Sequence, residues 1–161
     1  MSAVSKVLSL PRLIESLAPL RASGRTVALA NGLFDLLHVG HLRYLEGAKA
    51  EADVLVVAVN SDASARGLKG PARPIVKELE RAELVAGFGC VDFVTVFDEP
   101  SVEGVMRALR PDVHCKGTDY TRETVPEREI ARELGIRVAI VGDPKEHATR
   151  DLLSRILALP R

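Results

Sequence analysis

The stretch that decides the fold reads TVALANGLFDLLHVGH and spans residues 26–41. Residues 26–30 form an apolar run that is typical of a central strand in a parallel sheet. Leu42, Leu45 and Ala48 then follow at helical spacing. The sequence therefore predicts a strand, a turn that carries two histidines, and a helix that begins close to residue 40.

The start of that helix is a favourable place for a phosphate group. Its first N–H groups have no backbone partners and lie at the positive end of the helix dipole. Gly40 allows an anion to approach the backbone, and His38 and His41 are spaced so that both can face one phosphate. Imidazole donates a hydrogen bond when neutral and can become cationic near pH 7 as charge develops on a phosphoryl oxygen.

Two other interpretations of the histidine pair are weaker. In an isolated His-x-x-His, one ring commonly caps a helix and the other packs, but this pair follows a predicted parallel strand, where open α/β sheets bind ligands. A zinc site lacks ligands, because His114 and Cys115 are the only nearby candidates and the chain has no Cys-x-x-Cys. We therefore expect no metal bound mainly by the protein.

The rest of the chain alternates between short β-branched segments and helical patterns. Strands are predicted at residues 26–31, 54–60, 93–97, 113–116 and 138–141, and helices at 10–20, 101–110 and 126–134. This alternation predicts an α/β fold with a five-stranded parallel sheet and helices on both faces. We expect one domain over residues 1–161, with residues 1–24 as an N-terminal helical extension.

Composition indicates which kinds of molecule the protein is expected to bind. Lys plus Arg equals Asp plus Glu at 22 each, so the net charge does not favour nucleic acid or an anionic membrane. No apolar stretch approaches the ~20 residues of a membrane helix, and the first residues do not resemble a secretory signal. Cys90 and Cys115 fit reduced thiols better than a disulfide. These observations predict a cytoplasmic protein that acts on small molecules.

Residues 66–77 are rich in Gly and Pro and carry four cations, which predicts a basic loop rather than a helix. Such a loop can act as a mobile flap, from which Lys69 and Arg73 neutralise a triphosphate and exclude water. The alternative is a solvated surface loop without a catalytic role.

Polar residues also follow the second and fourth predicted strands. Asp119 can accept hydrogen bonds from hydroxyl groups and Tyr120 can stack or donate, although Asp119 capping a simple turn is an equally good interpretation. Asn60 and Asp62 are placed similarly, and the alternative there is that Ser61 or Asp62 only caps the next helix.

The pattern NGxFDxxHxGH at residues 31–41 resembles the signature of the cytidylyltransferase-like nucleotidyltransferases, in which His-x-Gly-His binds the nucleoside triphosphate. Further segments are similar to one branch, the D-glycero-β-D-manno-heptose 1-phosphate adenylyltransferases. They read VNSD (59–62), LKGPxRPIV (68–76), RAE (81–83), VDFV (91–94) and KGxDY (116–120). The resemblance covers nearly the whole chain and implies a Rossmann-like nucleotidyltransferase fold.

The residues and the resemblance together predict the site. The catalytic residues are expected to be His38, His41 and Lys69. Nucleotide binding is expected from Asn31, Gly32, Phe34, Asp35, Gly40, Lys116, Thr149 and Arg150. Substrate binding is expected from Asn60, Asp62, Arg73, Asp119 and Tyr120.

The resemblance implies transfer of AMP from ATP to a sugar 1-phosphate with release of pyrophosphate, in ADP-heptose synthesis for the lipopolysaccharide core. Mg²⁺ is expected to bridge triphosphate oxygens with few protein ligands. A homodimer is implied, and in a chain of 161 residues the usual kinase partner is expected to be a separate protein.

Two alternatives stay open, the first because it shares the histidine signature and the second because of one departure from the branch. Ala148, Thr149 and Arg150 stand where the branch has a Ser-Thr-Thr-like helix start, so two hydroxyl groups are missing. One alternative is a cytidylyltransferase that uses CTP and an alcohol phosphate such as glycerol 3-phosphate. The other is a nucleotide-binding regulatory module without turnover.

Overall fold

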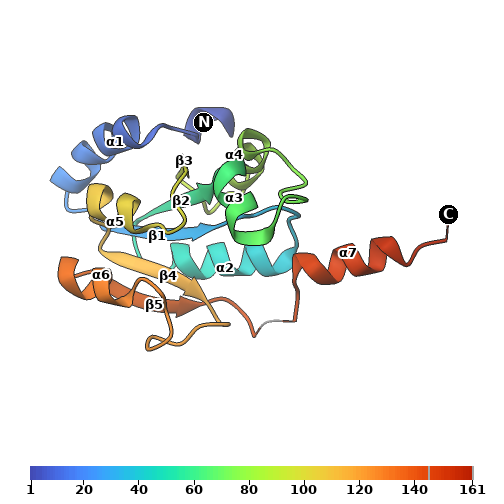
Figure 1. Ribbon diagram of the computed structural model, residues 1–161. Coiled ribbons are helices and arrows are strands. Elements are labelled where there is room, and N and C mark those ends of the chain that lie inside the picture. Colours follow the sequence, from blue (N-terminus) through green and yellow to red (C-terminus); the bar gives the residue numbers. More distant parts are fainter. Residues whose placement is uncertain (145, 161) are drawn as a thin grey trace.

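A computed structural model describes residues 1–144 and 146–160. Five parallel strands form one sheet in the order β3-β2-β1-β4-β5 (Figure 1). The strands are β1 (Val27–Gly32), β2 (Val54–Asn60), β3 (Phe93–Phe97), β4 (Val113–Gly117) and β5 (Arg137–Val141). The predicted α/β class and five-stranded parallel sheet are confirmed, and each predicted strand lies within one residue of the observed one. The predicted domain boundary at residue 161 falls outside the described residues.

Helices cover both faces of the sheet, as predicted. They are η1 (Val4–Lys6), α1 (Leu10–Ala22), α2 (Val39–Lys49), α3 (Asp62–Lys69), α4 (Glu78–Ala86), α5 (Glu103–Leu109), α6 (Arg128–Leu134) and α7 (Thr149–Leu157). Side chains of α2 and α4 pack on one face, and side chains of α1, α5 and α6 pack on the other. Two hydrophobic cores therefore enclose the sheet, which explains why all of β2 is buried.

The N-terminal segment is part of this core. Leu13 and Leu17 of α1 are fully buried against the sheet. Pro11 stands in the first turn of α1, where its missing N–H costs nothing. The predicted helix over residues 10–20 is confirmed and continues to Ala22.

The predicted loop over residues 66–77 is wrong in its first third, because α3 runs through Lys69. Ser61 caps this helix by accepting a hydrogen bond from Ser64 N–H at 3.1 Å. Ala65 is buried, and this packing outweighs the cost of about 1 kcal/mol for Gly67 in a helix. The helix ends at Gly70, whose φ of 97° few other residues adopt.

The strand order places a binding crevice at one end of the sheet. β1 pairs with β2 on one side and with β4 on the other, so the chain changes direction across the sheet between β1 and β4. Ligands of open α/β sheets bind outside the carboxyl ends of the strands at this point. Helix α7 begins on this side and projects from the body of the molecule (Figure 1). Among the described residues, no helix has both the length and the apolar character to span a bilayer.

Candidate active site

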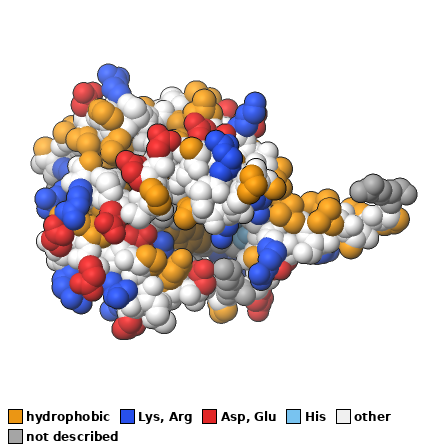
Figure 2. Space-filling view, viewed as in Figure 1, with side chains coloured by type: hydrophobic (Ala, Val, Ile, Leu, Met, Phe, Trp, Pro, Cys, Tyr) orange, Lys and Arg blue, Asp and Glu red, His pale blue; other side chains and the backbone are white. Residues whose placement is uncertain are grey.

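An open cavity of about 940 Å³ lies at the carboxyl ends of β1 and β4. Figure 2 shows a hollow at the base of the projecting helix, with histidine in it and Lys or Arg side chains beside it. All of the predicted site residues except Asp62 line this cavity. They are Asn31, Gly32, Phe34, Asp35, His38, Gly40, His41, Asn60, Lys69, Arg73, Lys116, Asp119, Tyr120, Thr149 and Arg150.

His38 and His41 form a stacked pair at the start of α2. Their ring centroids lie 3.9 Å apart at an interplanar angle of 28°. His41 Nδ1 accepts a hydrogen bond from His38 N–H at 3.3 Å, so a neutral His41 carries its proton on Nε2. Burial, helped by the neighbouring His38, lowers the pKa of His41 to about 4. His41 is therefore neutral at pH 7 in the free protein and can donate from Nε2.

The backbone around this pair is shaped by close contacts. A Cβ at position 40 would lie 2.9 Å from His38 Nδ1, so a side chain there would displace the His38 ring. Phe34 has a φ of 50°, in the left-handed region, and its ring lies 5.3 Å from that of His41. A Cβ at position 32 would meet the Phe34 ring at 3.1 Å. The left-handed backbone at Phe34 and the missing side chain at Gly32 therefore allow the Phe34 ring to pack beside His41.

Asp35 joins the turn after β1 to the segment after α3. Its buried carboxylate accepts hydrogen bonds from Arg73 Nε at 2.6 Å and from the N–H groups of Ile75 and Val76 at 2.9 Å each. Burial alone would raise the pKa of Asp35, but hydrogen bonds from Val76, Ile75 and Arg73 outweigh it and hold the pKa below its usual value. The predicted flap is thus tied down at residues 73–76, and Lys69 extends from its other end as an exposed cation.

Arg81, in the RAE segment, is a buried cation for which the sequence predicted no role in the site. Its side chain is fully buried and donates to the carbonyl groups of Leu33 (2.6 Å), Asn60 (2.8 Å) and Val76 (2.8 Å). It also forms an ion pair at 2.9 Å with Asp62, the predicted residue that does not line the cavity. Arg81 therefore holds together the ends of β1 and β2. Although the RAE segment is part of the resemblance, no local pattern predicts the burial of Arg81.

Asn31 is oriented by a buried histidine from the neighbouring strand. Asn31 Oδ1 lies 3.0 Å from His114 Nε2, and His114 is fully buried. Burial, with a smaller effect of the Lys116 charge, lowers the pKa of His114 to about 3, so the ring is neutral and donates from Nε2. The NH₂ group of Asn31 remains as a donor for a ligand.

Lys116 at the end of β4 is part of a buried ion pair. Its Nζ lies 3.5 Å from Glu127 Oε2 and 4.8 Å from the centroid of the Tyr120 ring. Only 9% of the Lys116 side chain and 6% of the Glu127 side chain are exposed. Glu127 lines the cavity and was not predicted, because it stands in a charged stretch that resembles an ordinary surface helix start.

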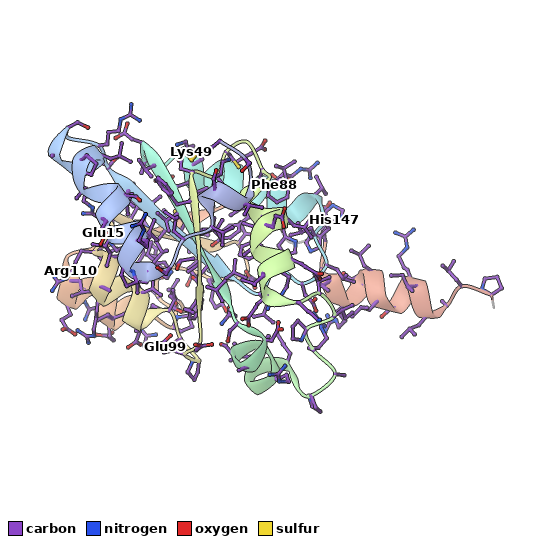
Figure 3. The ribbon with its side chains drawn as sticks, turned by 90° about the horizontal axis from the view of Figure 1, so that it is seen from above. Glu15, Lys49, Phe88, Glu99, Arg110 and His147 are labelled. Atoms are coloured by element: carbon purple, nitrogen blue, oxygen red, sulfur yellow. The ribbon has the colours of Figure 1, made fainter. Side chains whose placement is uncertain are left out.

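The start of α7 borders the cavity on the side of the histidine pair. Thr149 Oγ1 donates to the carbonyl of Leu36 at 3.2 Å, which brings the beginning of α7 against the turn before α2. His147, just before α7 (Figure 3), is exposed, and its ring centroid lies 6.3 Å from that of His38. Two helix N-termini and three histidines therefore meet at one side of the cavity, an arrangement suited to anionic oxygens.

Metal binding at this site would depend mainly on oxygens that the bound ligand supplies. Within residues 1–144 and 146–160 no three His, Cys, Asp or Glu side chains are grouped as a metal site. Asp35 is occupied by Arg73 and two backbone N–H groups. Mg²⁺ bound by triphosphate oxygens needs few protein ligands, and the site is compatible with this mode.

The site thus combines a parallel sheet whose cavity lies at the switch point with a His-x-Gly-His that begins a helix there. A cytidylyltransferase-like family model matches residues 29–154, and the chain belongs to that family. It is 46% identical over 137 residues to the bifunctional protein HldE of Syntrophotalea carbinolica, covering 85% of this chain and 28% of that protein. HldE of Geobacter sulfurreducens is 42% identical over 153 residues, covering 95% and 31%. The chain thus spans about a third of the length of these curated relatives.

A solved structure is also similar to this chain in fold and sequence. The lipopolysaccharide core biosynthesis protein from Thermoplasma volcanium superposes with a TM-score of 0.65 at 28% identity, covering 76% of this chain and 100% of that one. The predicted resemblance and the Rossmann-like fold are therefore confirmed.

Proposed function

We propose that this protein transfers AMP from ATP to a sugar 1-phosphate, with D-glycero-β-D-manno-heptose 1-phosphate as acceptor, and releases pyrophosphate. The observation that carries the proposal is the stacked pair of His38 and His41 at the start of α2. The lipopolysaccharide core protein among the similar structures and the HldE relatives support a role in ADP-heptose synthesis.

In this mechanism an oxygen of the sugar phosphate attacks the α-phosphorus in line with the leaving pyrophosphate. The attacking phosphate is already anionic, so the step requires no general base. His41 Nε2–H and the first N–H groups of α2 donate to α-phosphoryl oxygens as negative charge develops. His38, stacked on His41, serves the neighbouring phosphates.

Cations at the mouth of the cavity are assigned to the pyrophosphate and the acceptor. Lys69 is exposed and lines the cavity, so it can reach the β- and γ-phosphates. Arg73 uses Nε for Asp35, and its terminal nitrogens remain to bind the acceptor phosphate. Thr149 at the start of α7 is assigned to the triphosphate, and Arg150 replaces one of the missing hydroxyl groups with a positive charge. When bound together with ATP, Mg²⁺ would supply further positive charge at the triphosphate.

We also propose that the protein works as a homodimer and that a kinase upstream supplies the sugar 1-phosphate. Helix α7 supports dimerisation because it projects from the body and buries none of its residues. Ile156, Leu157 and Leu159 near its end are 56%, 83% and 66% exposed. Sedimentation velocity tests this: the dimer should dissociate in Leu157→Glu, whereas a wild-type monomer at micromolar concentration contradicts it.

The test of function is pyrophosphate release with Mg²⁺, using ATP or CTP against heptose 1-phosphate or glycerol 3-phosphate. Turnover only with ATP and the heptose is expected. Turnover with CTP and glycerol 3-phosphate would keep the mechanism and replace both substrates. Binding of ATP with no pyrophosphate release from any pair would favour the regulatory module, for which Ala148 and Arg150 in place of hydroxyl residues are the motivating observation.

A further inference from the structure

Glu127 is a buried acid in the wall of the cavity, immediately before α6. The residue is 5% exposed, and its Oε2 accepts no hydrogen bond from any described residue. Its one polar contact there is the 3.5 Å approach to Lys116 Nζ, which is long for a charge-assisted hydrogen bond. Buried carboxylate oxygens are normally satisfied by donors, so this covered oxygen retains an acceptor position that the described residues leave unfilled and that a donor from a ligand can fill.

The charges around Glu127 indicate what that ligand group is. Lys116 and Glu127 are both more than nine-tenths buried and together carry no net charge, so this wall lacks the positive potential that would hold a phosphate. The carboxylate only accepts hydrogen bonds and the ammonium group only donates them. A hydroxyl group matches both, because it can donate to Glu127 and accept from Lys116. An apolar ligand group would leave the carboxylate unsatisfied.

We propose that Glu127 and Lys116 form a subsite for neighbouring hydroxyl groups of a substrate. The proposal rests on the proposed function, which offers two sources of such groups, the ribose of the nucleotide and the sugar of the acceptor. The Tyr120 ring, 4.8 Å from Lys116 Nζ, fixes the ammonium group from one side. Glu127 is then a specificity residue, and Lys116 acts on hydroxyl oxygens rather than on phosphate.

The test combines removal of the Glu127 carboxylate with removal of single hydroxyl groups from the ligand. Dissociation constants are measured by calorimetry for ATP, 2′-deoxy-ATP and 3′-deoxy-ATP, and for mannose 1-phosphate and 2-deoxyglucose 1-phosphate, which differ only in the 2-hydroxyl. Removing the bound hydroxyl should weaken wild-type binding about 10- to 100-fold, the effect of a hydrogen bond to a charged group. Glu127→Ala should lose a similar factor with the complete ligand and little more with its deoxy form. If this coupling occurs with the ATP analogues, the bound hydroxyl groups belong to the ribose; if it occurs with the sugar phosphates, they belong to the acceptor.

Controls separate recognition from charge balance. Glu129→Ala, an exposed acid two residues away, should bind every ligand as wild type does. If Glu127→Ala fails to fold, Lys116→Met with Glu127→Leu removes both charges together and should show the same coupling. Equal losses with complete and deoxy ligands, coupling to the base when ITP replaces ATP, or no binding of either ligand class by wild type would each overturn the proposal.

The readout is binding, so it is independent of the reaction. If the proposed function fails, wild type releases no pyrophosphate while the coupling persists. If the subsite fails, pyrophosphate release continues without coupling.

Discussion

Arg73 Nε donates a hydrogen bond to Asp35 Oδ2 over 2.6 Å, and this contact links the turn after β1 to the segment after α3. Only 1% of the Asp35 side chain is exposed, against 20% for Arg73. The backbone N–H groups of Ile75 and Val76 donate to the same carboxylate. A segment that would otherwise be a free flap is thereby fixed beside the histidine pair.

Asp35→Asn should destabilise the protein, because it leaves Arg73 without its partner and removes a charged acceptor from two N–H groups. We expect the free energy of unfolding at pH 7 to fall by about 3 kcal/mol, measured by urea denaturation. Asp98→Asn, at an exposed acid, is the control and should change it by less than about 0.5 kcal/mol. A value for Asp35→Asn as small as that of the control would mean that the contact contributes little.

The same pair predicts a dependence on pH. The folded pKa of Asp35 lies below its ordinary value of 3.8, so the folded state binds this proton less readily than the unfolded state. The stabilisation is therefore fully present above about pH 4 and is lost as pH falls through the folded pKa. The gap in unfolding free energy between wild type and Asp35→Asn should stay constant from pH 8 to pH 5 and narrow below pH 4. A gap that already closes between pH 7 and pH 5 would point to another group.

His41→Ala should reduce kcat about 10²- to 10³-fold, the usual cost of one donor to a developing oxyanion. The exposed residue Val39 lies in the same helix turn, so Val39→Ala controls for disturbance of α2 and should keep near-normal turnover. Thermal unfolding of both variants checks that the fold is retained. Normal turnover of a folded His41→Ala would remove His41 from the mechanism.

Lys69 and Arg66 offer a matched pair, because both are exposed cations in the last turn of α3 but only Lys69 lines the cavity. Lys69→Ala should lower kcat/KM at least about 10-fold through lost contact with the triphosphate. Arg66→Ala should change it less than about twofold. Steady-state pyrophosphate release measures kcat/KM for both variants. Equal effects would mean that the two cations act only through the long-range electrostatic potential.

Nucleotide binding should be accompanied by proton uptake. His41 has a pKa of about 4 in the free protein, and the negative triphosphate beside it favours the cationic ring and raises that pKa. The added proton goes to Nδ1 and replaces the hydrogen bond that Nδ1 accepts from His38 N–H. Calorimetry of Mg·ATP binding at pH 6 in buffers of different ionisation enthalpy should therefore show net uptake, which declines towards pH 8. His41→Asn should show much less uptake, and an equal uptake in that variant would assign the proton elsewhere.

Local sequence patterns were sufficient for much of the fold. Apolar β-branched runs identified the five strands, because β-branched side chains favour the extended backbone and strands covered on both faces need apolar side chains throughout. The error at residues 66–69 arose from treating Gly67 as a helix breaker, when the Ser61 cap and the burial of Ala65 stabilise the helix. Such compensation depends on tertiary contacts that a local pattern does not contain.

In the candidate site, too, some residues followed from local sequence and others only from tertiary contacts. The sequence by itself determined the histidine pair and its helix start, since a strand, a tight turn and His-x-Gly-His follow one another within 16 residues. Only the tertiary structure decided which distant charges meet there. Arg81 joins the ends of β1 and β2, His114 orients Asn31 across neighbouring strands, and Glu127 pairs with Lys116 from the segment before α6. These partners are brought together by the strand order and the crossover helices, and buried charges and polar groups are stable only where such partners meet.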